Sequence, residues 1–458
     1  MRALLLLGCL AVNVAADAAT FTVTNGSASG TGSLRQAVLD ANATEGDPHL
    51  IEILPSADPI VLTQPLPELR RSLSITAQVR TRVITPRAGF ILAYREIGGT
   101  LNLTNLDVIA DENSAATASM GGCISVFDPR PGPLPWTISL TNVELTNCTA
   151  ASVAGSPAGG AIYVDGILTL ENSTIRAASI TGSGNGQGAA IYQRRGTLTL
   201  RRSRILFNGG PGARQGIVYL ANGSNLDAQD TEFAHNQLRA SDSGGVIYAA
   251  AGGVISLSRV AFADNYADQG TALTAFNSEV RIENTSFYRN ASSPTALFPT
   301  AVAVDGGTLA MRHNAFFDNT NHFAQLSGTI RGFSGNVFGP SRGGLCALQA
   351  MPAGAIANFG GGGCTAAGFA SSDVRIAGYG RVSSTDPVPL LTFAAGSPIF
   401  DAYGPTAGQS ATDFNRCAQV DARSNPRPRD DDGNGFSQCD AGPGESAQAV
   451  PMFRDGFE

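Results

Sequence analysis

The sequence predicts an all-β protein: a right-handed parallel β-helix, or solenoid, with three short strands per coil, an N-terminal capping helix and an irregular, disulfide-bearing C-terminal region. Three observations predict it. A bulky apolar residue recurs every 25 to 30 residues over much of the chain. In five consecutive units an asparagine follows it three positions later. Each unit also contains three short segments in which apolar and polar residues alternate, as they do in strands.

The recurring apolar residue defines the repeat. Equivalent residues of neighbouring coils in a solenoid lie about 4.8 Å apart, one above the next. We therefore expect these side chains to form one internal stack along the axis. Its members are Ile175, Ile205, Phe233, Phe262, Phe287 and Phe316, preceded by Val108 and Leu145.

The asparagines are interpreted as residues of the bend that follows each apolar position. Asparagine tolerates a left-handed backbone better than most residues. Its amide can also hydrogen-bond to the coils above and below, as in a ladder. We expect such a structural ladder, in preference to a ligand site, from Asn208, Asn236, Asn265, Asn290 and Asn319.

The other two strands of each unit have signatures of their own. One follows glycine, as in GGAIY at 159–163 and GGVIY at 244–248, and the other alternates leucine with polar residues, as in LTL at 168–170. None of these segments is long enough for a helix, and Gly, Asn and Ser separate them. A propeller blade, with four strands in about 40 residues, fits this spacing poorly.

The ends of the chain differ from the repeats. TGSLRQAVLDAN at 31–42 predicts a capping helix, because Ser33 and Gln36 have capping-box spacing. A solenoid needs such a cover at its ends. The predicted organisation is a signal peptide at 1–18, an N-terminal cap at 19–60, repeats at 61–340, a C-terminal cap or irregular region at 341–445, and a flexible tail with a candidate sorting tag at 446–458.

Composition and targeting signals limit the function classes. The first residues combine one arginine, a short apolar run and small residues, which predicts a secreted or surface-located protein cleaved near Ala18. No later segment approaches the about 20 apolar residues of a membrane helix. The net charge is −7 and lysine is absent, so we expect no nucleic-acid partner.

Six cysteines remain after removal of the signal peptide, an even number that suits an oxidising compartment. Sequence proximity favours three pairs, although six cysteines allow 15 connectivities. The favoured pairs are Cys123 with Cys148, Cys346 with Cys364, and Cys417 with Cys439.

Two sets of polar residues are candidate sites. The residues just before four ladder asparagines, His235, Asp264, Arg289 and Asp318, would form one outward column. We expect a charge ladder on the surface, and the alternative is a sugar-binding or catalytic stripe. Near the C-terminus, DDDGNG places Asp430, Asp432 and Asn434 at the 1-3-5 spacing of a calcium loop, with Asp440 close by. The alternative for that segment is a turn braced by a disulfide.

The sequence predicts no catalytic residue. The four histidines are scattered, and a lyase that uses lysine as its base is excluded because the chain has none. A polysaccharide-cleaving enzyme with arginine and carboxylates on an exposed face stays open. Loops of variable length fall at one corner of the coils, where solenoids often place a binding face.

Several motifs resemble known families. The pairing of GGAI-type and F-x-x-N tetrapeptides resembles the repeats of polymorphic outer membrane proteins. TVTNGSASGTGSLRQAVLDAN at 22–42 resembles a CSLREA-type segment, with Gly32 in place of its cysteine. GSPIFDA at 396–402, DARSNPRP at 421–428 and CDAG at 439–442 resemble choice-of-anchor Q proteins.

These resemblances imply a secreted or cell-surface bacterial β-helix protein, usually of unassigned activity. We expect an adhesin-like protein that binds a glycan or another cell-surface component, with Ca²⁺ as the one cofactor considered. The alternatives are a polysaccharide lyase or glycoside hydrolase that acts on an exposed face, and a structural component of the envelope. The sequence leaves the oligomeric state open.

Overall fold

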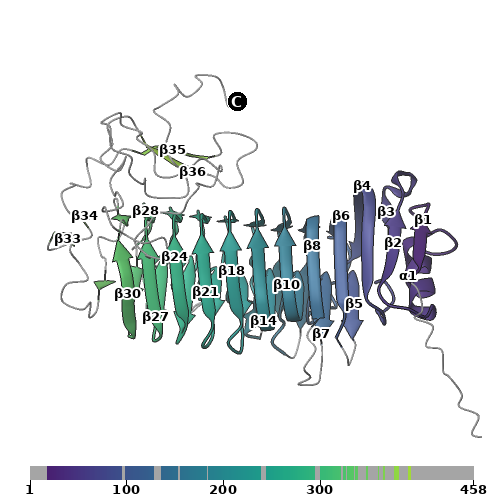
Figure 1. Cartoon of the computed structure of the whole chain (residues 1–458), viewed down its shortest axis with the longest axis horizontal. Coiled ribbons are helices and arrows are strands. Elements are labelled where there is room, and N and C mark those ends of the chain that lie inside the picture. The colour runs from purple at the N-terminus through teal and green to yellow at the C-terminus, as the bar shows by residue number, and fades with distance from the viewer. Residues whose placement is uncertain are drawn as a thin grey trace, which may run out of the picture.

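The computed structural model describes residues 18–94, 98–127, 136–152, 155–182, 184–238, 244–293, 300–320, 323–325, 327–334, 336–338, 347–348, 359–360, 365–366, 376–380 and 390–393. Short parallel strands wind around one long axis and stack coil on coil (Figure 1). The fold class predicted from the sequence is confirmed: the described residues form a parallel β-helix.

Each coil has three strand-bearing faces, numbered 1 to 3 in chain order. Face 2 lies toward the viewer in Figure 1. It contains β1 (Thr20–Val23), β2 (His49–Ile53), the first parts of β4 (Leu73–Pro86), β6 (Thr100–Asp111) and β8 (Trp136–Thr146), the last parts of β10 (Ile162–Glu171) and β14 (Ile191–Arg201), and then β18 (Asn225–Gln229), β21 (Val254–Ser258), β24 (Glu279–Glu283), β27 (Thr308–Arg312) and β30 (Thr329–Ser334).

Face 3 follows face 2 along the chain in every coil. It contains β3 (Ile60–Val61), the last parts of β4, β6 and β8, and then β11 (Thr174–Arg176), β15 (Arg204–Leu206), β19 (Glu232–Ala234), β22 (Ala261–Ala263), β25 (Ser286–Tyr288), β28 (Ala315–Phe317) and β31 (Val337–Phe338).

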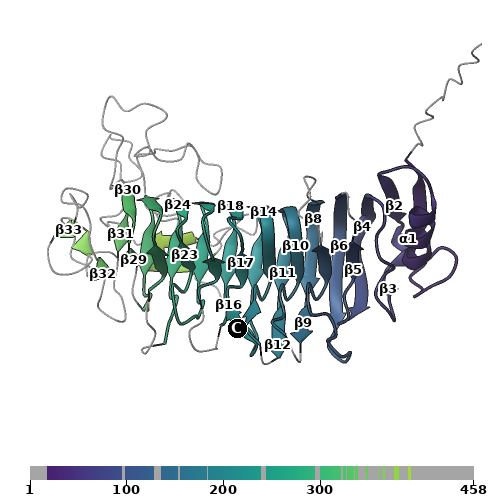
Figure 2. The same cartoon turned by 90° about the horizontal axis from the view of Figure 1, so that it is seen from below.

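Face 1 precedes face 2 and is seen from below in Figure 2. It contains β5 (Ile91–Tyr94), β7 (Ile124–Phe127), the first parts of β10 and β14, β17 (Val218–Leu220), β20 (Ile247–Ala249), β23 (Leu273–Phe276), β26 (Val302–Asp305), β29 (Phe323–Gln325) and β32 (Ala347–Leu348). The predicted three strands per coil are therefore separate in the later coils, whereas in the earlier coils two of them merge across a bend.

Smaller elements lie beside these faces. The pairs β9 (Thr149–Ser152) with β12 (Ser179–Gly182) and β13 (Gly186–Gln187) with β16 (Ala213–Gln215) are parallel. The pairs β33 (Phe359–Gly360) with β34 (Thr365–Ala366) and β35 (Ile376–Gly380) with β36 (Leu390–Phe393) are antiparallel. A single 3₁₀ turn, η1, spans Pro55–Ala57 among the described residues.

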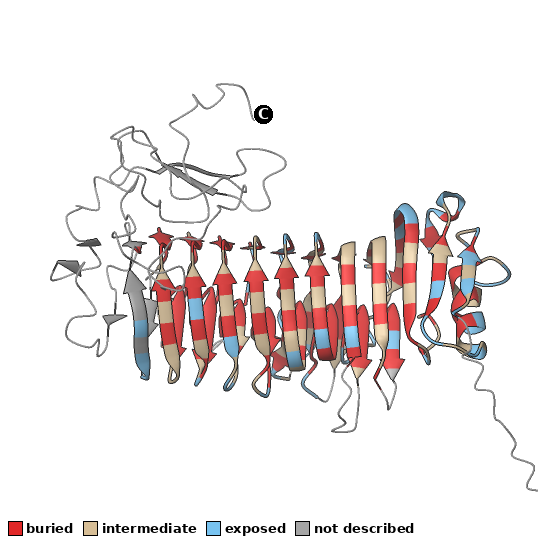
Figure 3. Ribbon diagram, viewed as in Figure 1, coloured by how far each residue is buried: buried red, intermediate tan, exposed pale blue. Residues whose placement is uncertain are grey.

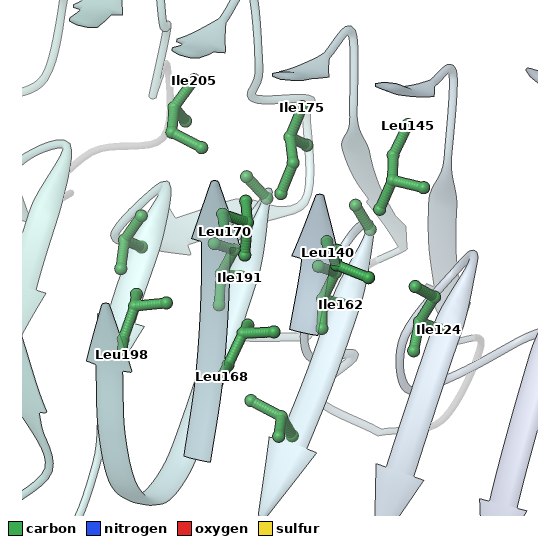
Figure 4. Close-up of a cluster of buried hydrophobic side chains, with 14 of the residues drawn as sticks. Ile124, Leu140, Leu145, Ile162, Leu168, Leu170, Ile175, Ile191, Leu198 and Ile205 are labelled. Carbon is green, nitrogen blue, oxygen red and sulfur yellow. The ribbon is translucent and has the colours of Figure 1, made fainter. Parts of the chain in front are cut away.

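The core is a set of apolar columns that run along the axis. Buried residues alternate with partly exposed ones along the strands of face 2 (Figure 3). Figure 4 shows the columns from several coils, with Leu145, Ile175 and Ile205 in one of them. This column continues as Phe233, Phe262, Phe287 and Phe316, whose ring centroids lie 4.9, 5.2 and 4.3 Å apart. Nearly parallel rings at the coil spacing fill the interior without gaps.

The N-terminal end is covered by α1 (Leu34–Ala43). The Ser33 side chain accepts a hydrogen bond from the Gln36 backbone N–H at 3.2 Å, and Leu34, Ala37, Val38 and Ala41 face the core. The reciprocal half of the capping box does not form. The Ser33 N–H donates instead to Gly30, and the Gln36 amide donates to Asp40.

The bends before and after face 3 place one residue each in the left-handed backbone region, and this corrects the interpretation of the asparagines. After face 3, the left-handed residues include His235, Asp264, Arg289 and Asp318, with φ between 53° and 55°. Each ladder asparagine comes one position later, where the side chain turns inward. The predicted binding stripe is thus the column of left-handed turn residues, for which short polar side chains are favoured.

The glycines of the GGAI-type motif have a geometric cause. Gly159 and Gly188 both have φ of 66°, a conformation that strains a residue with a Cβ atom. At Gly160 a Cβ atom would lie 1.9 Å from the carbonyl oxygen of Ala189 in the next coil. The motif therefore marks the approach to face 1, where backbone of adjacent coils is in close contact.

The predicted disulfide between Cys123 and Cys148 is confirmed. Both residues are fully buried, and Cys148 occupies the place in its coil that an asparagine takes in later coils. The other four predicted cysteines lie outside the described residues.

Candidate functional site

The asparagine column uses its amides within the solenoid. Asn236 N–H and its Nδ2 both donate to Asn265 Oδ1, at 3.1 and 3.0 Å. Asn265 Nδ2 donates in turn to the carbonyl of Phe233 and to Asn290 Oδ1, both at 2.9 Å. The same pattern joins Asn208 to the column at one end and Asn319 at the other. These amides are buried and engaged, so they stabilise coil stacking and offer nothing to a ligand.

A second ladder, which was not predicted from the sequence, lies at the corner between faces 2 and 3. The Ser173 N–H donates to Ser203 Oγ at 3.2 Å. Further along, the Thr285 N–H donates to Asn314 Oδ1 at 2.9 Å, and Asn314 bonds to Asn336 in the same way. The signal was present as a recurring Ser, Thr or Asn two residues before the stacked apolar position.

Residues of the predicted stripe contact one another and neighbouring aromatic rings. His235 stacks on Phe207 with ring centroids 4.8 Å apart. Arg289 forms an ion pair with Asp264 at 2.8 Å and lies over the Tyr288 ring. The Asp264 carboxylate, together with a hydrogen bond to Tyr288, raises the pKa of Arg289. A partly exposed ion pair of this kind contributes only modestly to stability.

An ion-pair cluster lies at the start of face 3. Asp107 and Glu144 are neighbours in register on adjacent coils. Arg80 bonds to both carboxylates and to Asn142, and Arg176 lies 3.8 Å from Glu144. No local sequence motif marks this cluster, because its four charged residues are spread over nearly a hundred positions.

An aromatic column runs along the outer side of face 1. Tyr163, Tyr192, Tyr219 and Tyr248 stack at 4.9, 5.1 and 5.4 Å, with nearly parallel rings. Rings this close leave no space for a sugar between them, so only their edges and hydroxyls face outward. Burial, and then the neighbouring phenols, raise the pKa of Tyr163 and of Tyr219 to about 12.

Face 2 carries an uncharged polar surface, here termed the hydroxyl face. Its outward residues form columns in register across five coils, about 4.8 Å apart between strands and about 6.8 Å along them. It consists of Ser74, Thr76, Thr100, Asn102, Thr104, Thr137, Ser139, Thr141, Thr169, Thr197 and Thr199. One apolar residue, the exposed Ile167, interrupts it between Thr137 and Thr197.

The hydroxyl face is open and flat. All its residues are partly or fully exposed, and the side chains of Ser139, Thr169 and Thr199 make no hydrogen bond within the described residues. Its columns end at charged residues, which are Glu171, Arg201 and Asp227. Alternation within LTL-type strands predicted outward polar residues, but only the register across coils shows that they form one array.

The calcium candidate, Asp430, Asp432, Asn434 and Asp440, lies outside the described residues, as do the signal peptide and the tail at 446–458. Among the described residues, no group of three or more His, Cys, Asp or Glu side chains is arranged to hold a metal ion. In the same part of the chain no helix has the length and apolar character needed to cross a membrane.

Comparison with known proteins gives few matches. No protein-family model and no curated protein matches the sequence. Among solved structures, a PL6 family alginate lyase, AlyGC, aligns with a TM-score of 0.36 and 11% identity over 71% of this chain. The aligned part spans 40% of the lyase chain. At this level of similarity the alignment supports no conclusion about activity, and the resemblances to secreted β-helix families rest on the quoted motifs.

Proposed function

We propose that this chain is a secreted or cell-surface β-helix protein that binds a neutral polysaccharide surface through the hydroxyl face. The observation that carries the proposal is the array itself: hydroxyl and amide groups in register over five coils, interrupted by Ile167 and without a charged side chain among them. Such an array matches a partner that is itself repetitive, polar and uncharged.

The energetics favour an extended partner. One neutral hydrogen bond contributes only about 0.5–1.5 kcal/mol net. A small sugar that reaches two or three hydroxyls would therefore bind weakly, after the cost of association. A polymer that spans several coils can form many such hydrogen bonds. Each further bond forms while the earlier ones already hold the polymer, which is the advantage of multivalent binding. An anionic polysaccharide fits less well, because the face has no cation at its centre.

A matched pair of variants tests the proposal. Thr169 lies at the centre of the hydroxyl face, and Ser256 lies in the same column beyond its charged edge. We expect Thr169→Lys to weaken binding to immobilised neutral glucan or chitin by about tenfold or more, equivalent to about 1.4 kcal/mol. Ser256→Lys should bind as the wild-type protein does.

The readout is depletion of the protein from solution by insoluble polysaccharide, supported by a glycan array. Failure of the wild-type protein to bind any neutral glycan would contradict the proposal, and so would equal loss in both variants. Absence of all glycan binding, with an intact fold, would favour the alternative of a structural envelope component.

A second candidate function is polysaccharide cleavage at the ion-pair cluster of Arg80, Asp107 and Glu144. The specific observation is the pair of carboxylates on adjacent coils, close to the about 5 Å separation used by retaining glycosidases. Against it, Arg80 engages both carboxylates directly. A reducing-end assay decides: activity that disappears in Arg80→Gln but persists in Arg204→Gln, on the same face, would favour the enzyme.

A further inference from the structure

The outward side of face 3 changes character along the solenoid. In the early coils it carries charged and exposed side chains, such as Arg176 and Arg204. In the later coils most residues of the same two outward columns are small or apolar and buried, and Glu232 and Tyr288 are the partly exposed exceptions. The members, here termed the covered patch, are Ala234 (2% exposed), Ala261 (0%), Ala263 (1%), Ser286 (0%), Ala315 (0%) and Phe317 (0%).

Small size alone does not explain this burial. Ala310 points outward from face 2 at the same end of the solenoid, and it stays partly exposed. Phe317 is a large ring on the outer side of its strand and is nevertheless inaccessible. The buried Ser286 hydroxyl has no hydrogen-bond partner. A layer of protein must therefore lie against the outside of β22, β25 and β28.

The adjoining corner shows the same change. The left-handed turn residues Asn172 and Arg202 are exposed in the early coils. Their equivalents Arg259, Asn284 and His313 are buried in the later ones. Both the face and its corner thus become covered over the same coils, which indicates one continuous covering element and not a chance contact of a single side chain.

The position of the covered patch identifies the occupant. The exposed fractions are those of a single chain, so the segment that covers the patch belongs to this chain. The patch lies at the end of the solenoid where the chain leaves the coils after β30 and β31. Figure 1 places the β35–β36 hairpin beyond the edge of the solenoid at which β28 is labelled. In Figure 2 the yellow-green strands of the hairpin overlap the coils near the label β23.

We propose that the β35–β36 hairpin docks on the covered patch and forms a second layer on face 3. Removal of this apolar surface from water stabilises the contact. The docking would leave face 2 open and direct external partners to it. This inference does not depend on the proposed glycan binding, since it concerns a different face.

Thiol labelling of the full chain tests whether the patch is covered. Leu206 and Ala263 occupy the same outward column of face 3, Leu206 partly exposed and Ala263 buried. We expect a maleimide to modify Ala263→Cys at least tenfold more slowly than Leu206→Cys, as measured by mass spectrometry of the peptide that contains each residue. Equal rates would mean that the face is open, and the proposal would be wrong.

A second measurement identifies the occupant. Ala263→Arg places a charge in the patch, and Leu206→Arg is its matched control. We expect hydrogen exchange in residues 376–393 to become faster in Ala263→Arg and to stay unchanged in Leu206→Arg. Slow labelling of Ala263→Cys together with unchanged exchange in 376–393 would assign the cover to another segment. Protection that depends on protein concentration would assign it to a second copy, and either outcome overturns the proposal.

Discussion

At the scale of single residues, the repeat is governed by two adjacent positions with opposite roles. The first, such as Asp264, has a left-handed backbone and directs its side chain outward. The second, such as Asn265, directs its amide inward and is buried. Because the two are neighbours in sequence, an outward column of variable polar residues accompanies the uniform ladder. The variation in the outer column is therefore tolerated by the fold and does not by itself indicate a binding stripe.

The ladder predicts a large loss of stability when one amide is removed. Asn265→Ala deletes the acceptor of two bonds from Asn236 and the donor to Phe233 and Asn290. Buried groups that lose their partners cost about 1–3 kcal/mol each. We expect a decrease of about 3 kcal/mol or more in the free energy of unfolding, measured by chemical denaturation. Asp264→Asn, on the partly exposed neighbour, should change it by less than about 0.5 kcal/mol. Similar small effects of both would show that the ladder contributes little.

At the scale of elements, the stacked tyrosines of face 1 make the stability of the fold depend on pH. The four phenol rings come from consecutive coils and lie with one edge outward, and each ring stacks on the next. The ring of Tyr248 also packs against Gly244, where a Cβ atom would lie 1.9 Å from it. Close packing on both sides removes water from the rings, and burial of a phenol disfavours its charged form.

The raised pKa values of Tyr163 and Tyr219, about 12 each, predict alkaline destabilisation. In the unfolded chain a tyrosine loses its proton near a pH of about 10. Between about pH 10 and 12 the unfolded state therefore binds fewer protons, and the free energy of unfolding falls as pH rises. Below about pH 10 these two residues add no pH dependence.

Phenolate absorbance during an alkaline titration checks this prediction. A late fraction of the tyrosines should ionise only near pH 12 or on unfolding. That fraction should shrink in the double variant Tyr163→Phe, Tyr219→Phe. Titration of all tyrosines of the folded protein near the ordinary phenol pKa of about 10 would contradict the burial of the column.

At the scale of the whole molecule, much of the fold could be predicted because a solenoid is almost one-dimensional. A side chain at one position of the repeat contacts its equivalents, so the spacing of Phe233, Phe262, Phe287 and Phe316 already indicates which residues touch. The same holds for the asparagines. The left-handed turn was placed one residue too late, since a propensity identifies asparagine as tolerant but does not say which of two adjacent residues bends.

The surfaces were less predictable than the core. The hydroxyl face can be recognised only when the register of face 2 is known. That register depends on loops of variable length between Ser139 and its neighbours Asn102 and Thr169. The cluster around Arg80 has no local motif at all. The covered patch depends on a segment far away in sequence, and small residues such as Ala261 give no signal for what lies against them.

The recurrence of the same corner geometry has a consequence for how this protein can change length. Asn236 and Asn265 are 29 residues apart and play identical parts in consecutive turns. Excision of residues 234–262 would join Phe233 to Ala263 and rebuild an equivalent turn from the two halves. Such a rod grows or shrinks by whole units through duplication or deletion of a gene segment, while every remaining layer keeps its neighbours.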